Sequence, residues 1–572
     1  MQNLLVLFIF YFVCSISIIG YGTLFLNLLS KKSKFYDIGY LGIFGLILTV
    51  LISYLSNLVV PHSHFFNSIY VVIGLISLYF FFKRNYRNKI LYKNIKTFFI
   101  IFLLIFISLL ISKNHDDFSY YHFVSTYNLT QFDSLIGTGQ FLHGFRTPSS
   151  IFYINSLFYL PIIEFYSFNF ATVFVLGFSN IILLNKINIY DLLKIDQFQK
   201  KIIRIDASTF FSFLSLIFIN IFFYRLSEHG TDRSAQILIM VLFSEMLKLL
   251  DKKPMKLDLN FKILPLIVFI ISLKSFYIFY LAFFIPVYFY YLQFYSLKEL
   301  IFNNILKLYS VIFVLIFILM LGTYFFSSGC LIYPVEITCL ENFSWSIPLS
   351  QVESMHLWYQ QWSKAGAGPN FRIEDPAQYV QNFNWLNNWL EKYFFNKVSD
   401  FLLGLAFLII VIVVTFSKIS SRKKKLSFNK FQLFFFLTIF ILLSEWFLNR
   451  PALRYGGYIL IASILLIPLS LFLSSFEFEF KKLKVSVVSL LLITLLIFLG
   501  RNIHRINKEN KIYNYNPFQN AFYEIKPKYL NEYKKISDLI NNYENCKANL
   551  KCNNKMFNRV DKKFGKYIFK NQ

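Results

Sequence analysis

The chain has 572 residues and is strongly apolar and basic: 56% of its residues are hydrophobic, 15% are charged, and the net charge is +27. Soluble domains carry roughly a quarter charged residues, so an ordinary soluble protein is excluded. The long apolar runs instead indicate a polytopic membrane protein. The basic residues lie in short clusters between these runs rather than in one patch, which argues against nucleic acid as a partner.

Apolar runs alternate with polar segments along most of the chain, and they predict an all-α, polytopic transmembrane helix bundle of about 13 or 14 spans. The runs lie near residues 3–29, 38–60, 66–82, 97–112, 165–184, 207–224, 235–250, 263–275, 277–293, 305–326, 398–417, 431–447, 457–475 and 485–500. The first run has neither a basic start nor a cleavage site, so we expect it to remain as a helix. The runs at 235–250 and 263–275 are the weakest and predict broken or tilted helices inside the bundle.

The distribution of lysine and arginine predicts the topology. Basic residues are in excess in the segments 31–37, 83–96, 185–206, 251–262, 418–430 and 476–484. A chain that crosses the membrane at each run places all six segments on one side, and the positive-inside rule makes that side the cytoplasm. The expected location is therefore the bacterial inner membrane, with the N- and C-termini in the periplasm.

This topology divides the chain into six parts. They are N-terminal transmembrane helices (1–112), a periplasmic loop with acidic and HGxR motifs (113–164), central transmembrane helices (165–326), a large periplasmic loop (327–397), C-terminal transmembrane helices (398–500) and a periplasmic tail (501–572). Two close cysteine pairs, Cys330/Cys339 and Cys546/Cys552, fall in periplasmic parts. Disulfides persist in oxidising compartments, and these spacings do not suit structural zinc. We therefore expect two disulfide loops, with free thiols as the alternative.

An acidic and aromatic segment, 113-KNHDDFSYYHFVSTYNLT-130, follows the fourth apolar run. Ionisable groups at the edge of a membrane are candidates for function. An α-helix lying on the membrane surface places Asp116, Asp117, Tyr120 and Tyr121 on one side, and His115, Ser119 and His122 on another. Carboxylates beside phenolic hydroxyls suit a general base, so Asp117 is the expected base, with Asp116 and His122 as further catalytic candidates.

Two other interpretations of this segment remain open. The helix can be purely interfacial, with its acids in water and its aromatic residues among the headgroups. Alternatively, Asp116, Asp117 and a histidine can hold a divalent metal, although the segment lacks a firm ligand spacing. Apart from that metal, no cofactor is expected, because the chain has neither a Walker-type loop nor a dinucleotide fingerprint. The missing Walker loop also argues against ATP-driven transport.

Further polar residues on the periplasmic side predict binding of an anionic substrate. They are His143 and Arg146 in 143-HGFRTP-148, Asp232 in 227-SEHGTDRS-234, Lys274 in 268-VFIISLKSFYIFY-280, and Arg450 and Arg454 in 449-NRPALRYGG-457. Arginine binds phosphate in bidentate fashion, and a lysine between apolar runs must pair, snorkel or face a polar cavity. As alternatives, the arginines bind lipid headgroups and Asp232 caps the following helix.

Tryptophan is concentrated in the large periplasmic loop. Trp345, Trp358, Trp362, Trp385 and Trp389 all lie there. These side chains predict stacking surfaces for sugar rings, or alternatively an aromatic belt at the membrane interface.

Short motifs in a fixed order carry a family resemblance. They are Asp117…Tyr121-His122, Gly139…His143-Gly144-x-Arg146, Asn155-Ser156-x-x-Tyr159, Thr231-Asp232, Leu273-Lys274-Ser275, 329-GCLIYPVEITC-339 with Trp345, Pro451-x-x-Arg454-Tyr455 and Cys546…Cys552. This order resembles an uncharacterised family of large bacterial integral membrane proteins, which is similar to the GT-C superfamily of membrane glycosyltransferases. One departure is that the acidic loop follows the fourth apolar run, whereas GT-C enzymes generally have it after the first.

The resemblance implies a GT-C-like bundle in which a loop carboxylate is the catalytic base and arginines bind the phosphate of a polyprenyl-phosphate-linked sugar. By position the base is Asp117, and the leading phosphate ligand is Arg454, followed by Lys274 and Arg146. We therefore expect an inverting glycosyltransferase or glycan polymerase whose partners are membrane lipid, the lipid-linked sugar and a glycan or lipid acceptor. The alternative is a non-enzymatic flippase or transporter of lipid-linked glycans. For an enzyme, Asp117, Lys274 and Arg454 should line one outward-facing cavity.

Overall fold

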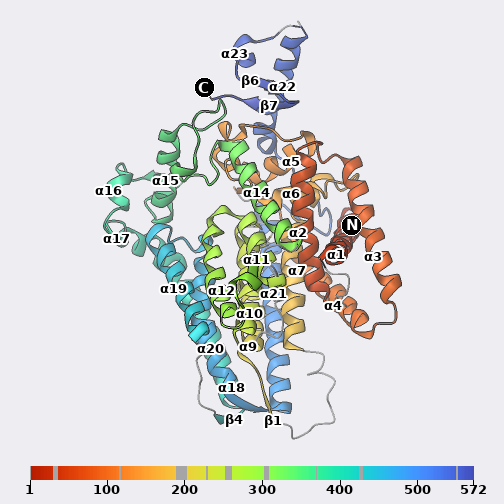
Figure 1. Ribbon diagram of the computed structural model, residues 1–572, viewed down its shortest axis with the longest axis vertical. Helices are drawn as coiled ribbons and strands as arrows, with labels where there is room; N and C mark the ends of the chain where they lie inside the picture. The colour runs from red at the N-terminus through yellow and green to blue at the C-terminus, as the bar shows by residue number, and fades with distance from the viewer. Residues whose placement is uncertain are drawn as a thin grey trace.

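The apolar runs of the sequence are helical in the computed structural model of the protein (Figure 1). The structure describes residues 2–29, 37–114, 117–188, 202–226, 230–251, 260–301, 308–368, 370–423, 430–548, 550 and 552–571. Within these residues, helices make up nearly all the regular structure and strands are confined to three small sheets. The fold is an all-α, polytopic transmembrane helix bundle, as the composition predicts.

Eleven helical segments of the described residues are long and apolar enough to cross a membrane. They are α1 (Gln2–Leu29), α2 (Ile38–Asn57), α3 (His64–Asn85), α4 with η1 (Lys89–Ile105, Phe106–Leu109), η5 with α7 (Glu164–Ser167, Phe170–Ile187), η8 with α12 (Ser275–Phe283, Phe284–Leu292), α14 (Leu308–Ser328), α17 with η11 and α18 (Leu386–Trp389, Leu390–Val398, Ser399–Ser417), α19 (Lys430–Asn449), α20 (Gly457–Ser474) and α21 (Phe480–Tyr513).

The other three runs are also helical, but they are not among these spans. They form α9 (Ala207–Phe222), α10 (Gly230–Asp251) and α11 (Asn260–Leu273). With 16 and 14 residues, α9 and α11 are shorter than the roughly 20 residues that a straight span needs. Helix α10 has 22 residues but carries charge near both ends. The expected 13 or 14 spans exceed eleven for this reason.

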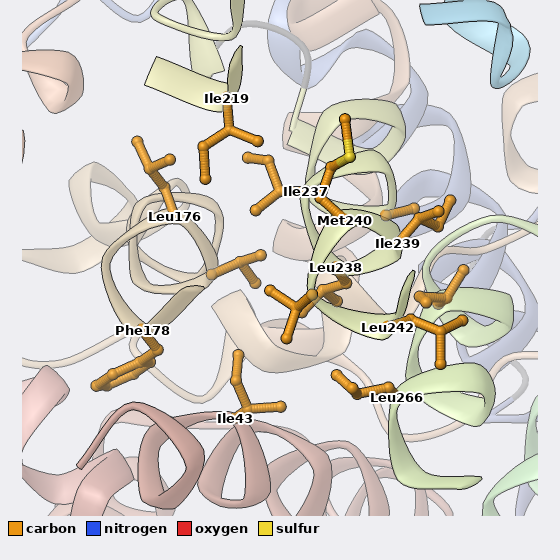
Figure 2. Packing of buried hydrophobic residues seen from close by; sticks show 14 of the residues in the cluster. Ile43, Leu176, Phe178, Ile219, Ile237, Leu238, Ile239, Met240, Leu242 and Leu266 are labelled. Carbon is orange, nitrogen blue, oxygen red and sulfur yellow. The ribbon is translucent and has the colours of Figure 1, made fainter. Parts of the chain in front are cut away.

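Helix α10 lies at the centre of the packed core. Figure 2 shows Ile43 of α2, Leu176 of α7, Ile219 of α9 and Leu266 of α11 around the side chains of α10. The four consecutive residues 237–240 of α10 are fully buried, and a helix that is apolar on every side must be enclosed by others. The prediction that the runs at 235–250 and 263–275 lie inside the bundle is confirmed. Within a membrane such a core is held by close van der Waals packing.

One end of the bundle, called the sheet end here, carries a three-stranded antiparallel sheet. Its strands are β1 (Ile202–Arg204), β5 (Phe476–Glu479) and β4 (Ser420–Lys423), in the order β1-β5-β4. The three strands come from three of the six basic segments of the sequence. Because the strands are hydrogen-bonded to one another, these three segments lie on the same side of the bundle, as the charge pattern predicts.

The opposite end, called the site end here, carries most of the irregular structure. Its elements are η2 (Phe118–His122), α5 (Phe123–Gln131), η3 (Thr138–Gln140), η4 (His143–Phe145), α6 (Ser150–Ser156), η10 (Glu336–Thr338), α15 (Leu349–Ser363), β2 (Ala367–Gly368), β3 (Phe371–Arg372), α16 (Pro376–Val380), η12 (Leu453–Tyr455), η13 (Pro527–Leu530), α22 (Asn531–Lys547), α23 (Asn554–Phe557), β6 (Val560–Lys563) and β7 (Lys566–Phe569). The short helix α13 (Leu297–Leu300) lies between α12 and α14.

The C-terminal tail packs on the first loop of the site end. Ile136 forms a bridge with Ile568 of β7, and Asn3 Nδ2 donates a hydrogen bond of 2.8 Å to Asn520 Oδ1. The beginning of α1 and the tail therefore lie at the same end of the bundle (Figure 1). Helix α21 continues to Tyr513, so the boundary expected at residue 500 falls inside this helix.

Both cysteine pairs expected from the sequence form disulfides at the site end. Cys330–Cys339 joins the chain after α14 to η10, and Cys546–Cys552 closes a small loop after α22. Cys14 in α1 is a buried free thiol. The segments expected in an oxidising compartment are therefore the ones that carry the disulfides.

Candidate functional site

Four charged side chains from four separate segments form a continuous series of ion pairs at the site end. Arg454 Nη2 lies 2.9 Å from Asp117 Oδ2, and Arg454 Nε lies 3.0 Å from Asp232 Oδ2. Lys274 Nζ lies 2.9 Å from Asp232 Oδ1. Arg454 is separated from Asp117 by 337 positions and from Asp232 by 222, so only the fold brings these groups together. We call the four residues the charge network.

Each member of the charge network lies at the end or at a break of a helix. Asp117 precedes the π-helical turn η2, and Asp232 is in the first turn of α10. Lys274 has an extended backbone between α11 and η8, and Arg454 is in η12 between α19 and α20. Gly456, which follows, has a φ of 101°, a conformation that glycine adopts without strain. Such breaks are tolerated at membrane depth where they are enclosed by protein or line a cavity.

The charge network is partly buried, and its members hold one another ionised. The Asp232 side chain is 6% exposed, whereas those of Asp117 and Arg454 are 25% and 32% exposed. Burial raises the pKa of Asp232, but Lys274 and Arg454 outweigh it and hold that pKa well below its ordinary value. Burial likewise lowers the pKa of Lys274, and Asp232 more than reverses this shift. Asp232 is thus an anchor for two cations rather than a proton acceptor.

The network borders a cavity of about 210 Å³. Asp117, Lys274 and Arg454 all line this cavity, as the sequence predicts, and Asp232 lies directly behind it next to Thr231 of the lining. Helix α15 forms one wall of the cavity with Trp358, Tyr359 and Trp362. Trp362 lies about one helical turn after Trp358. The cavity therefore combines a carboxylate, cations and aromatic rings.

The HGFR segment forms part of the lining. Gly144 is required there because a Cβ atom at this position would lie 2.6 Å from Cγ of Tyr121. Burial raises the pKa of Tyr121 to about 12, so its phenol remains protonated. His143 Nδ1 lies 3.2 Å from Tyr120 Oη, and its ring lies 5.9 Å from that of Trp358. Burial lowers the pKa of His143 from its usual value, which favours the neutral ring.

Arg450 adds a further cation to the cavity. Its guanidinium carbon lies 5.6 Å from the centroid of the Phe276 ring. In the part of the chain that the structure describes, Arg450 forms no salt bridge. Together with Lys274 and Arg454 it makes three cations against the two carboxylates of the network. Among the described residues, the site thus carries one more positive than negative charge, which favours an anionic ligand.

Besides Asp232, two described residues expected at the site, Arg146 and His122, do not line the cavity. Arg146 donates from Nη1 to Tyr333 Oη at 2.6 Å and from Nε to the carbonyl of Gly139 at 3.0 Å. Arg146 thus contacts Tyr333, which lines the cavity, and the expected role of Arg146 as a substrate ligand stays a prediction. His122 packs 5.2 Å from Phe152, and its buried Nε2 has no hydrogen-bond partner among the described residues.

Burial also changes the pKa of His122. Burial lowers its pKa to about 3, although Asp117 opposes this shift, so the ring is neutral near pH 7. The sequence prediction placed His122 on one face of the segment by assuming an α-helical rotation of 100° per residue. The chain instead forms a π-helical turn here, which has a different periodicity. Asp116, the alternate base, lies outside the described residues.

Only two of the five tryptophans of the loop reach the cavity, namely Trp358 and Trp362. Trp345 packs 4.7 Å from Phe343, and Trp385 is buried in the core. Trp389 is also buried, with its indole N–H donating to a backbone carbonyl at 3.0 Å. Those three tryptophans are structural.

Several lining residues were not singled out as ligands from the sequence, among them Ser149, Tyr333, Tyr359 and Tyr455. Tyr333 lies within the motif at 329–339 and Tyr455 follows Arg454, so the motifs pointed to both. Tyr359 and Ser149 carry no such signal. Among the described residues, no three His, Cys, Asp or Glu side chains are grouped so that they could hold a metal ion. The arrangement is suited to binding an anionic group and to moving a proton.

Comparison with known proteins identifies a family but no function. A family described as a domain of unknown function (DUF8201) matches residues 4–461. This range includes the whole charge network and Arg450. No curated protein and no solved structure matches the chain. With most of its length matched, the chain, a multi-pass membrane protein, belongs to the DUF8201 family.

Proposed function

We propose that the protein is a membrane glycosyltransferase or glycan polymerase with a periplasmic active site in the bacterial inner membrane. It transfers a sugar from a polyprenyl-phosphate-linked donor to a glycan or lipid acceptor. The observation that carries the proposal is the cavity in which Asp117 faces Lys274, Arg450 and Arg454 beside an aromatic wall. The ordered motifs that resemble GT-C enzymes supply the class of donor.

The cations of the cavity bind the phosphate of the donor. Arg450 has no salt bridge in the described part of the chain, and its guanidinium fork matches phosphate oxygens. Lys274 and Arg454 contribute two more positive charges at the same cavity. These groups stabilise the negative charge that develops on the departing phosphate, and such electrostatic stabilisation is usually the largest contribution to catalysis.

Arg454 links donor binding to activation of the acceptor. Its Nε is held by buried Asp232, while its Nη2 is on Asp117. A bound phosphate competes for Nη2, and the carboxylate of Asp117 is then released to accept a proton. The acceptor oxygen forms a bond to the anomeric carbon as the bond from that carbon to the phosphate oxygen breaks. The acceptor proton goes to Asp117, and the polyprenyl phosphate leaves with the electron pair, with inversion at the sugar.

The wall from α15 holds the sugar between donor phosphate and acceptor. Trp358 and Trp362 are four residues apart on one helix and therefore present their rings on one face. Aromatic rings bury the apolar face of a ligand while their polar atoms keep hydrogen-bonding capacity. Arg454 lies over the Trp362 ring, 5.6 Å from its centroid, so phosphate and sugar positions are adjacent.

A flippase of lipid-linked glycans is the second candidate. It is favoured by a further buried ion pair at the sheet end of α10, where Lys186 Nζ lies 2.9 Å from Glu245 Oε1. Ionisable groups buried on both sides of a bundle are common along transport pathways. The two functions differ in product, because a flippase moves the lipid-linked sugar and leaves its glycosidic bond intact.

The test is consumption of lipid-linked sugar in membranes that contain the parent or Asp117→Asn. We expect the substitution to lower turnover by about 10²- to 10⁴-fold, the usual contribution of a general base. The control is Asp133→Asn, which breaks an ion pair with Lys566 on the same loop but outside the cavity. Unchanged turnover in Asp117→Asn contradicts the proposed base. A parent that moves the donor across vesicles without cleaving it supports the flippase.

A further inference from the structure

A second cavity, of about 560 Å³, lies at the site end where α21 leaves the apolar part of the bundle. It shares no lining residue with the candidate site. Its walls come from the chain after η1, around Ser112, from the segment after α9, around Tyr224, and from the last part of α21. The proposed function uses none of these residues.

Helix α21 contributes a basic stripe to this cavity. Arg501, His504, Arg505 and Lys508 line it, and their spacing of three, four and seven residues places them on one face of the helix. The apolar run at 485–500 ends immediately before Arg501. Basic side chains directly beyond an apolar span lie at the depth of the lipid headgroups.

The charges of this cavity are unbalanced. Among the described lining residues of α21, Arg501, Arg505 and Lys508 accompany a single carboxylate, Glu509, which gives these four residues a net charge of +2. Both oxygens of that carboxylate are occupied, one by Arg505 Nη1 at 3.0 Å and one by a backbone N–H at 2.9 Å. The cavity therefore offers positive charge that no lining carboxylate neutralises.

Arg505 is held rigidly and still has an unused donor. Its side chain is 6% exposed, and Nη1 and Nη2 donate to the carbonyls of Leu110 and Ile107. Its buried Nε has no hydrogen-bond partner among the described residues. A buried donor without a partner is costly, and an entering acceptor removes that cost. Nearby Lys508 is exposed and forms no salt bridge in the described part of the chain.

We propose that this cavity binds a phosphate group, either as the headgroup of an anionic membrane lipid or as a free phosphate. Phosphate oxygens accept charge-assisted hydrogen bonds from arginine and lysine, and the group supplies the missing negative charge. Asn114 is three residues before Asp117 in the sequence, and Arg225 is six before Thr231, so two segments of the chain contribute to both cavities. The phosphate site stands independently of the chemistry of the proposed active site.

The test measures binding of a fluorescent short-chain phosphatidylglycerol to the purified full-length protein in neutral detergent, with inorganic pyrophosphate as competitor. Lys508→Gln should weaken binding about tenfold, because a hydrogen bond to a charged group is lost. Lys511→Gln is the matched control: it removes the same charge from the same exposed helix end, one turn away and outside the cavity. It should bind as the parent does. Arg501→Gln should behave like Lys508→Gln.

The outcomes separate the two sources of phosphate. Lipid binding that depends on Lys508 supports a headgroup site, and Lys508-dependent binding of pyrophosphate without the lipid supports free phosphate. Equal binding by parent and Lys508→Gln, or equal weakening in Lys511→Gln, overturns the proposal. Thermal unfolding of each variant establishes that it is folded. Because binding is the readout, failure here leaves the glycosyltransferase proposal untouched, and the reverse also holds.

Discussion

The two ends of α10 each bury a carboxylate between cations beside a cavity. Among the described residues, only at the site end does one of these cations also bind a second carboxylate that lines the cavity. At the site end Asp232 binds Lys274 and Arg454, and 13 residues later, about 20 Å along the helix, Glu245 binds Lys186. Glu245 is 3% exposed and also accepts a hydrogen bond from Tyr40.

The difference between the ends lies in what surrounds each carboxylate. At the site end Arg454 reaches onward to a second carboxylate, Asp117, which is 25% exposed and lines the cavity. At the sheet end Lys186 instead donates to Ser244 of α10, and the cavity beside it, about 240 Å³, is not lined by Glu245. An exposed carboxylate, Asp206, does line that cavity, but it caps α9 by accepting from the N–H of Thr209 and forms no salt bridge in the described part of the chain. A buried ion pair can therefore be an anchor in both places, while the proposed chemistry needs an accessible carboxylate paired with a cation of the network.

The largest expected effect is on stability at the sheet end. Glu245→Gln leaves Lys186 buried without its charge partner, and breaking such a pair costs about 3–5 kcal/mol. The melting temperature in detergent should fall clearly, and Asp232→Asn should behave similarly. Glu544→Gln, which breaks an exposed pair with Lys562, should cost less than about 1 kcal/mol. If Glu245→Gln melts like the parent, the anchor role is wrong.

Substitution of Arg450 should lower turnover without lowering the melting temperature. Because it forms no salt bridge in the described part of the chain, Arg450→Gln should leave the melting temperature near that of the parent. Turnover of lipid-linked sugar should fall about 10²-fold, the scale of one lost donor to developing charge. Turnover within twofold of the parent would remove Arg450 from the proposed phosphate site.

The tryptophans give a smaller, matched comparison. Trp358 lines the cavity, whereas Trp345 packs on Phe325 and Phe343 outside it. Trp358→Ala should raise the apparent KM for the sugar donor about tenfold, since aromatic contacts contribute roughly 0.5–1.5 kcal/mol beyond burial. Trp345→Ala should leave KM unchanged in whatever protein remains folded. Equal KM changes in both variants contradict an aromatic sugar wall.

The smallest effect concerns pH. Burial holds the pKa of His122 at about 3 in the folded protein, against an ordinary value of 6.5. Between these values the unfolded chain binds the extra proton, so stability falls as the pH is lowered, by up to about 1.4 kcal/mol per pH unit. His122→Gln should show a weaker loss of melting temperature between pH 6.5 and 5.5. Parallel pH profiles of the melting temperature in the parent and in His122→Gln would contradict this prediction.

Much of the fold could be predicted from the sequence because membrane-spanning helices have a recognisable apolar composition. All fourteen apolar runs are helical, and three basic segments meet in one sheet, because hydropathy and lysine–arginine bias act locally. The cysteine pairs followed from their close spacing and from the oxidising side of the membrane to which the charge pattern assigns them. The number of spans could not be predicted correctly from the sequence, because α9, α10 and α11 are apolar but are enclosed by other helices.

The candidate site was predictable only in part. Asp117, Lys274 and Arg454 could be singled out because charge at membrane depth is unusual. That Asp232 would bridge Arg454 and Lys274 depends on contacts across hundreds of residues, and no local pattern encodes them. Arg146 and His122 were misplaced because a motif shows which groups are polar and not whether they face a cavity or a neighbouring loop.

The central claim is that an accessible carboxylate paired with a cation of the charge network, Asp117 with Arg454, distinguishes the site end of α10 from its sheet end. The most direct measurement compares turnover of lipid-linked sugar and melting temperature in Asp117→Asn and Glu245→Gln. We predict that Asp117→Asn loses turnover by at least about 10²-fold while melting within a few degrees of the parent, because its ion pair is only partly buried. Glu245→Gln should lose stability, and its folded fraction should keep the turnover of the parent. Full turnover in Asp117→Asn would contradict the account.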